Sequence, residues 1–207
     1  MRSVDTLIEI FMKFPGVGPR QARRFVYFLL GKNGTFIAEL NEALQKLSKE
    51  MRLCESCFRY FHKENGNTSA VCSICSDTHR DEHSLLIVSG NVDLESIEKS
   101  GYWKGRYFVL GGIVPILEKN PEQRIKLKEL KQKIEKEGKK KILKEIVLAL
   151  NTTPEGENTS LFLQSNLEPL FKEHSIKISV LGRGLSTGAE LEYADSETIK
   201  NALQNRH

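Results

Sequence analysis

The four cysteines set the tightest limit on how the chain can fold, because they form two Cys-x-x-Cys pairs and none is left over. Two such turns bring four thiolates to the corners of a tetrahedron, the geometry of a closed structural zinc site. We therefore predict one structural Zn²⁺ per chain, bound by Cys54, Cys57, Cys72 and Cys75. Disulfides are the alternative, and a reducing cytosol disfavours them. Four cysteines leave no open coordination position, so we expect the metal to stabilise the fold rather than catalyse, and the nearby histidines to be surface residues: His62, His79 and His83.

Composition places the chain among ordinary globular proteins. Hydrophobic residues make up 39% of its 207 residues and charged residues 28%, which excludes a disordered or membrane-embedded chain. No apolar run approaches the roughly 18 to 20 residues that span a bilayer. The first residues mix acids into apolar positions, unlike a secretory signal. We therefore expect a cytoplasmic protein that does not contact membranes.

Basic charge gathers at the N-terminus, where residues 1–32 hold six basic and two acidic residues. This excess equals the net charge of +4 of the whole chain. Residues 3–13 and a second segment that begins at Pro19 carry apolar residues at helical spacing, and Pro-Gly-Val-Gly lies between them. On a helix, the second segment directs its arginines away from an apolar stripe formed by Ala22, Phe25, Val26 and Leu29.

Two helices joined by Gly-Val-Gly resemble the helix-hairpin-helix, a unit that binds DNA without reading its sequence. Glycine permits a positive φ and close backbone approach, so amides of the hairpin and of the second helix's first turn can converge on a phosphate. The predicted DNA-binding residues are Gly16, Val17, Gly18, Arg20, Arg23 and Arg24. The alternative is an ordinary helical hairpin with solvated arginines, because short Gly-x-Gly matches are common.

After the cysteines the pattern changes to short, nearly continuous apolar runs that alternate with helical segments. These runs are typical of strands buried on both faces of a mostly parallel sheet, and they span residues 84–89, 106–112, 145–150 and 177–182. The lysine-rich segment 126–145 spaces Leu127, Leu130 and Ile134 as a helix does, so we interpret its charges as a solvated helix face. In such sheets the functional surface lies at the carboxyl ends of the strands.

The segment after the third run, Asn-Thr-Thr-Pro-Glu-Gly-Glu at 151–157, resembles the Toprim motif of topoisomerases and bacterial primases. Those enzymes have Asp-x-Asp before Glu-Gly-Glu and a glutamate after the first strand. Here Asn151 and Thr153 take the aspartate positions, and Ser89 or Gly90 takes that of the glutamate. Magnesium needs hard anionic oxygens, and the remaining candidates, Asp93, Glu155 and Glu157, lack the required arrangement. We therefore predict no catalytic residue and no enzyme activity.

Taken in order, these features resemble the RecR family of bacterial recombination mediators over essentially the whole chain. The resemblance is carried by "FPGVGPRQA" near the start, "CSDTHRD" (75–81), "NTTPEGE" (151–157) and "RGLSTGAELEYADSETIKNAL" (183–203), the last being the most specific. It implies a multi-domain α+β protein. The implied parts are a helix-hairpin-helix domain at 1–53, a zinc-finger motif at 54–76, a Toprim domain at 77–178 and a C-terminal oligomerisation segment with a helix at 179–207.

The resemblance also implies a DNA-repair role in which the protein acts with RecO, and in many bacteria RecF, to load RecA at single-stranded gaps. It implies dimers and ring-shaped tetramers, in which joining several hairpins would raise their effective concentration on DNA. A further hypothesis is a surface for a basic partner, with helix caps and solvated surface as the alternative: Glu155, Glu157, Glu190, Glu192 and Asp195. The rival function is an active Toprim enzyme of the primase or topoisomerase class, which would need the missing Asp-x-Asp.

Overall fold

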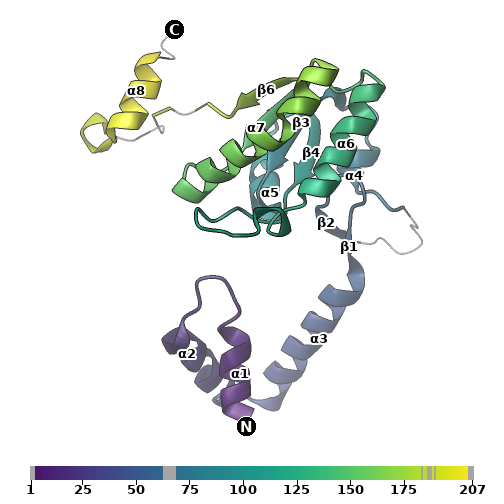
Figure 1. Cartoon of the computed structure of the whole chain (residues 1–207). Coiled ribbons are helices and arrows are strands. Elements are labelled where there is room, and N and C mark those ends of the chain that lie inside the picture. Colours follow the sequence, from purple (N-terminus) through teal and green to yellow (C-terminus); the bar gives the residue numbers. More distant parts are fainter. Residues whose placement is uncertain (1–2, 63–68, 183, 186–187, 189, 205–207) are drawn as a thin grey trace. The chain divides into compact units, whose positions relative to one another are not determined.

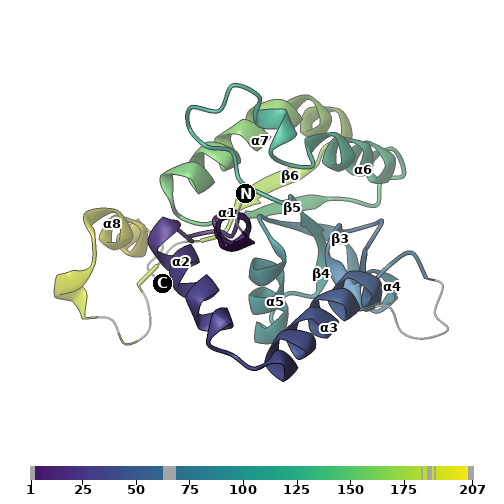
Figure 2. The ribbon, with the colours of Figure 1, turned by 90° about the horizontal axis from the view of Figure 1, so that it is seen from below.

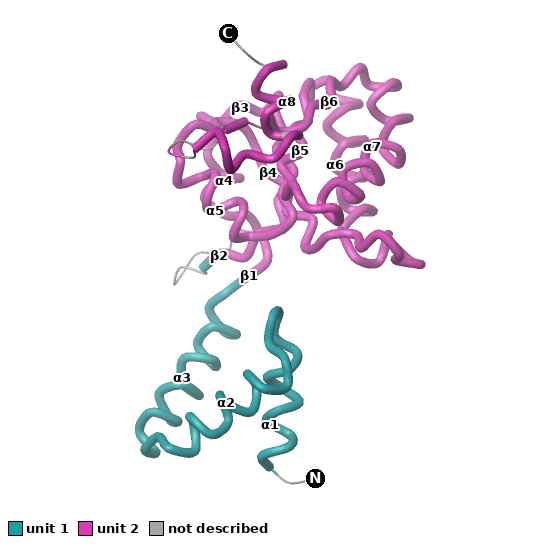
Figure 3. Tube along the Cα trace, turned by 90° about the vertical axis from the view of Figure 1, so that its left-hand side faces the viewer, with its two compact units in different colours: residues 1–51, 62–65 teal, residues 52–61, 66–207 magenta. Residues whose placement is uncertain are grey.

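The computed structural model describes residues 3–62, 69–182, 184–185, 188 and 190–204. The chain forms two compact units, one of residues 1–51 with 62–65 and the other of residues 52–61 with 66–207 (Figure 3). Four residues of the predicted tail motif lie outside the described residues: Arg183, Ser186, Thr187 and Ala189. No helix in the described ranges is both long and apolar enough to cross a membrane.

The first unit is helical and consists of α1 (Ser3–Phe11), α2 (Pro19–Leu30) and α3 (Gly34–Glu50) (Figure 1). The predicted stripe of α2 packs inward, because Ala22 and Val26 are buried and the Phe25 ring meets Phe11 of α1 edge-on at 5.6 Å. Helix α1 ends two residues before the predicted boundary, and the chain then turns toward the hairpin. Asn33 caps α3 by accepting a hydrogen bond from the Phe36 N–H at 3.0 Å.

The second unit is built around a parallel sheet. In the chain, this sheet is preceded by a two-stranded sheet of β1 with β2. Its longest helix is α7, which begins at Pro154, within the predicted polar segment 151–157. In chain order, the strands and helices from β1 onward are β1 (Met51–Leu53), β2 (Tyr60–His62), α4 (Ser73–Ser76), β3 (Asp81–Val88), α5 (Asn91–Ser100), β4 (Gly105–Val109), α6 (Leu127–Lys139), β5 (Glu145–Ala149), α7 (Pro154–His174), β6 (Lys177–Val180) and α8 (Ser196–Gln204).

The sheet has the strand order β4-β3-β5-β6, and every neighbouring pair is parallel. This confirms the predicted α/β region, and each strand begins within three residues of its predicted run. Val88, at the end of β3, lies opposite both Val109 of β4 and Ala149 of β5. The segments that follow β3 and β5 therefore emerge side by side at the carboxyl edge of the sheet.

Helices α6 and α7 cover one face of the sheet (Figure 2). The predicted stripe of α6 is confirmed, because Leu127, Leu130 and Ile134 are all buried in this core. Exposed lysines occupy other positions of the same helix, among them Lys128 and Lys136. The lysine-rich composition of this segment is thus compatible with a helix whose apolar residues all face inward.

The opposite face of the sheet is covered by α5 and by the cysteine-rich segment (Figure 2). Leu86, Val88 and Tyr107 of the sheet belong to one buried cluster with Leu94 of α5. Ile74 and the cysteines Cys54, Cys57 and Cys72 belong to the same cluster. The cysteine-rich segment is therefore part of the core of the second unit rather than an appendage to it.

Candidate functional site

The four cysteines come together as the sequence predicts. Their Sγ atoms all lie within 4.8 Å of one another, and those of Cys57 and Cys72 are 3.7 Å apart. A tetrahedral zinc site with Zn–S bonds of about 2.3 Å has Sγ–Sγ edges of about 3.8 Å. All four cysteines are free, so the structure contains none of the disulfides considered as the alternative. The cluster can hold one metal ion.

The backbone around the cysteines is shaped to point the sulfur atoms inward. Phe58 adopts a left-handed conformation with φ of 61°, which closes the first turn, and its N–H donates to the Cys54 carbonyl at 2.9 Å. The Cys72 N–H donates to the Cys54 Sγ at 3.3 Å. Hydrogen bonding with Cys54 and burial raise the pKa of the Cys57 thiol, so a bound cation is needed to hold four thiolates there. The donor set therefore fits a divalent metal.

Hydrogen bonds tie the cysteine cluster to strand β4. The Val109 N–H donates to the Cys57 carbonyl at 2.8 Å, and the Arg106 guanidinium donates to the Cys75 carbonyl at 2.5 Å. Arg106 also pairs with Glu82 of β3 at 2.6 Å. A disturbance of the metal site is thus expected to reach the edge strand of the sheet.

The motif that leaves the cluster, residues 75–81, fixes the chain to α5 and β4. Arg80 donates to the Gly105 carbonyl at 3.2 Å and forms an ion pair with Glu98, whose other carboxylate oxygen accepts the Tyr107 hydroxyl at 2.9 Å. Burial and the hydrogen bond to Glu98 raise the pKa of Tyr107 well above its ordinary value. His62, His79 and His83 are exposed, as predicted.

The hairpin between α1 and α2 has the predicted backbone geometry. Gly16 has a positive φ of 74°, and in the part of the chain that the structure describes no atom beyond its chain neighbours lies within 4 Å of the position that a Cβ would occupy there. Gly18 is extended and precedes Pro19, the first residue of α2. Because glycine has no side chain to cap the helix, the amides at the start of α2 keep their hydrogen-bonding capacity toward an anion.

Three arginines occupy the exposed face of α2, opposite Ala22 and Val26. Arg20, Arg23 and Arg24 are exposed, and no carboxylate of the described part of the chain forms an ion pair with them. Tyr27 shares this face, being four residues after Arg23 and three after Arg24, and its side chain is 61% exposed. The DNA-binding residues predicted from the sequence do not include Tyr27. The spacing of Tyr27 from Arg23 and Arg24 could have shown that it shares their face of the helix.

The degenerate Toprim motif leads from β5 into the start of α7. The Thr153 hydroxyl, at one aspartate position, accepts the Gly156 N–H at 3.2 Å and so caps the helix. A Cβ on Gly156 would lie 2.9 Å from the Asn151 carbonyl carbon and closer still to its oxygen. Across the neighbouring strand end, the Asp93 carboxylate accepts the Gly90 N–H at 3.0 Å and the Ser89 hydroxyl, and so caps α5.

The acidic residues proposed to face a partner fall into two groups. Glu155 and Glu157 lie in the first turn of α7, where they suit the positive end of the helix. Glu190, Glu192 and Asp195 lie in the tail that leads to α8. Asp195 accepts hydrogen bonds from the Thr198 N–H at 2.9 Å and from its hydroxyl at 2.7 Å, as a helix cap does.

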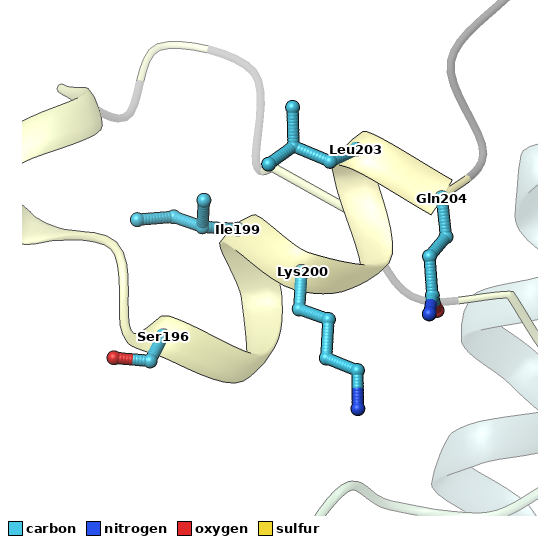
Figure 4. A pocket seen from close by; sticks show the side chains of 5 residues that line it. All are labelled: Ser196, Ile199, Lys200, Leu203 and Gln204. Atoms are coloured by element: carbon cyan, nitrogen blue, oxygen red, sulfur yellow. The ribbon is translucent and has the colours of Figure 1, made fainter.

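Helix α8 is amphipathic. Ile199 and Leu203 project from one side of it, whereas Lys200 and Gln204 project from another (Figure 4). The Leu203 side chain is 58% exposed.

Together these features define the class: a protein in which a helix-hairpin-helix and a four-cysteine cluster accompany a Toprim-like sheet with neutral residues at two aspartate positions of the motif. The chain matches three family models, described as RecR, helix-hairpin-helix (residues 4–47), Toprim domain (83–182) and RecR, C-terminal (184–207). It is 32% identical to Recombination protein RecR of Bdellovibrio bacteriovorus over 206 residues, 99% of this chain and 96% of that protein.

Two further relatives give the same result. Identity to Recombination protein RecR of Phytoplasma mali is 33%, covering 99% of this chain and 94% of that protein, and to that of Lactobacillus acidophilus 32%, covering 97% and 94%. The chain belongs to the RecR family. Its role therefore lies in DNA recombination and repair.

Proposed function

We propose that this protein is a DNA-binding recombination mediator that acts without chemistry of its own. The observation that carries the proposal is the face of α2, where exposed Arg20, Arg23 and Arg24 have no carboxylate partner in the described ranges and adjoin the Gly16 turn. Amides at a helix start bind one phosphate, and arginines beside it bind the neighbouring phosphates. Such contacts do not depend on base sequence.

The test is the salt dependence of duplex binding. Each phosphate contact contributes about 0.9 to the slope of log K against log[salt]. The double variant Arg20→Ala/Arg24→Ala should therefore flatten the slope by about 2 for any DNA sequence. Lys128→Ala/Lys136→Ala, on the exposed face of α6, is the matched control and should leave the slope unchanged. Unchanged binding by the arginine variant would refute the proposal.

The absence of catalysis is the second part of the proposal. The support is that Asn151 and Thr153 are neutral, that the Thr153 hydroxyl serves as a helix cap, and that Asp93 caps α5. An active Toprim enzyme, the rival function, needs free carboxylates at these positions. Magnesium-dependent cleavage, relaxation or primer synthesis by the pure protein, lost on substitution of Glu155 and Glu157, would establish the rival.

The metal in the cysteine cluster is proposed to be one structural zinc ion per chain. Four sulfur ligands and a tetrahedral spacing favour Zn²⁺ over ions that prefer oxygen ligands. When bound, the metal would fold the cluster, because no position remains for a substrate. Metal analysis of protein purified without chelator should find one zinc per chain, and none would exclude the site.

We propose that the protein forms an oligomer, in which several hairpins that each bind DNA weakly act together and bind it tightly. Helix α3 exposes an apolar stripe, and α8 exposes Leu203 beside Ile199 (Figure 4). Both are suited to contact another copy of the chain, and the stripe of α3 consists of Ile37, Leu40, Leu44 and Leu47. We propose the domain division 1–53, 54–76, 77–178 and 179–207, with the last segment in this role. Light scattering should give the mass of a dimer or tetramer. A monomer at all concentrations would contradict the proposed oligomerisation.

The proposed protein partners are a RecO-like protein, in some bacteria with a RecF-like one, and the proposed outcome is RecA loading at single-stranded gaps. A basic partner surface would meet Glu155, Glu157, Glu190, Glu192 and Asp195, the last of which is exposed although it caps α8. Charge reversal of Glu155 and Glu157 should weaken capture of the RecO-like protein at low salt. Binding that is unaffected by reversal would remove these acids from the interface.

A further inference from the structure

The exposed face of α2 holds an aromatic ring among its arginines, and this ring has the position of a base-stacking residue. Tyr27 lies one helical turn beyond Arg23 and Arg24 on the same side of the helix. Five side chains surround one surface hollow on α2: Arg20, Arg23, Arg24, Tyr27 and Phe28. All five belong to the first unit, so the hollow does not depend on where the second unit lies.

The two aromatic rings of this hollow differ in what they contact. Phe28 packs against the Phe36 ring of α3, edge-on at 6.0 Å, and the Lys32 ammonium lies 4.4 Å from its ring centre. The Tyr27 ring contacts no other aromatic ring of the described residues, and 61% of its side chain is exposed. An exposed ring of this size, held on a helix and flanked by arginines, presents a flat apolar face to an anionic ligand.

We propose that Tyr27 stacks on an unpaired base of single-stranded DNA while the neighbouring arginines hold the flanking phosphates. The proposal rests on the DNA-binding function proposed above and adds to it a preference for single strands. An aromatic ring can stack only on a base whose face is uncovered, which a continuous duplex does not offer. Hairpin amides and arginines serve both forms of DNA, whereas Tyr27 contributes to one of them.

The experiment compares three variants on a fluorescein-labelled thymidine oligomer and on a duplex of random sequence. Tyr27→Leu should weaken single-strand binding by about 5- to 100-fold, the loss expected for one stacked base. Duplex binding should change by less than about twofold, because the phosphate contacts remain. Tyr27→Phe keeps the ring and should bind like the wild type. Tyr102→Leu removes a tyrosine that is 92% exposed in the other unit and should change neither affinity.

A second readout reports stacking directly. Single-stranded oligomers that each carry one 2-aminopurine should show a fluorescence change with the wild type and with Tyr27→Phe, but not with Tyr27→Leu. Equal losses for single strands and duplex in Tyr27→Leu would overturn the inference. So would a changed mass of that variant in solution, which would place the ring between copies of the chain.

The failure of this inference can be told apart from that of the proposed function. If Arg20→Ala/Arg24→Ala loses affinity for both forms of DNA while Tyr27→Leu loses none, DNA binding stands and stacking is excluded. If the arginine variant binds both forms like the wild type, the proposed function fails, and the stacking proposal fails with it.

Discussion

The substitution Gly156→Ala sets helix propensity against packing, and the structure decides which effect wins. Gly156 is the third residue of α7, and alanine is favoured over glycine in a helix by about 1 kcal/mol. A Cβ at this position would lie 2.9 Å from the Asn151 carbonyl carbon and closer to its oxygen. These are backbone atoms, which cannot rotate away as a side chain could.

Crowding of this kind typically costs about 1 to 3 kcal/mol, and a backbone obstacle places this site at about 3 kcal/mol. Subtracting the propensity gain of about 1 kcal/mol leaves a destabilisation of about 2 kcal/mol. Helix propensity alone would predict a change of opposite sign in the free energy of unfolding, that is, a stabilisation. The disturbance should also shift the strand end at Asn151 away from the start of α7.

Urea unfolding followed by tryptophan fluorescence measures this effect in the second unit. The chain has one tryptophan, Trp103, which is partly buried and donates a hydrogen bond to the Arg106 carbonyl at 3.1 Å. Gly182→Ala is the matched control, because Gly182 has an ordinary φ and, among the described residues other than its chain neighbours, no atom lies within 4 Å of the position that its Cβ would take. If Gly156→Ala proved as stable as the wild type or the control, the close approach to Asn151 would be wrong.

Three further outcomes are expected. Cys72→Ser should abolish zinc binding, which metal analysis measures. It should also speed amide hydrogen exchange at Val109, because the Val109 N–H donates to the Cys57 carbonyl. Unchanged exchange at Val109 would contradict the coupling between the cysteine cluster and strand β4. Thr153→Ala should lower the free energy of unfolding by about 1 kcal/mol through loss of the cap, whereas Thr153→Asp should retain it; equal losses would contradict the capping role. Folding raises the pKa of Tyr107. The neutral phenol therefore contributes its full stabilisation below the ordinary tyrosine pKa of about 10. This stabilisation is lost as the pH rises from about 10 through the higher pKa of the folded state. Tyr107→Phe should therefore flatten the decline in stability above about pH 10 in denaturant titrations, and an unchanged slope would refute the shift.

The features that could be predicted before the structure was known are those that local chemistry encodes. Cysteine spacing, the Gly-Val-Gly turn and the periodicity of apolar residues each act over a few residues. They predicted that the four cysteines meet, that a glycine turn joins two helices, and that the four apolar runs form a mostly parallel sheet. The neutral residues at the two aspartate positions of the Toprim motif, Asn151 and Thr153, are likewise identified from the sequence alone.

The contacts between residues far apart in the chain became known from the folded molecule. It placed the cysteine cluster in the core beneath the sheet, bonded the Val109 amide to the Cys57 carbonyl, and brought Gly156 against Asn151. It also distinguished Phe28, whose ring meets Phe36 of α3, from Tyr27, whose ring meets no aromatic ring of the described residues. Packing and hydrogen bonding between residues far apart in the chain depend on how whole elements dock, and the pattern of a single segment does not contain that information.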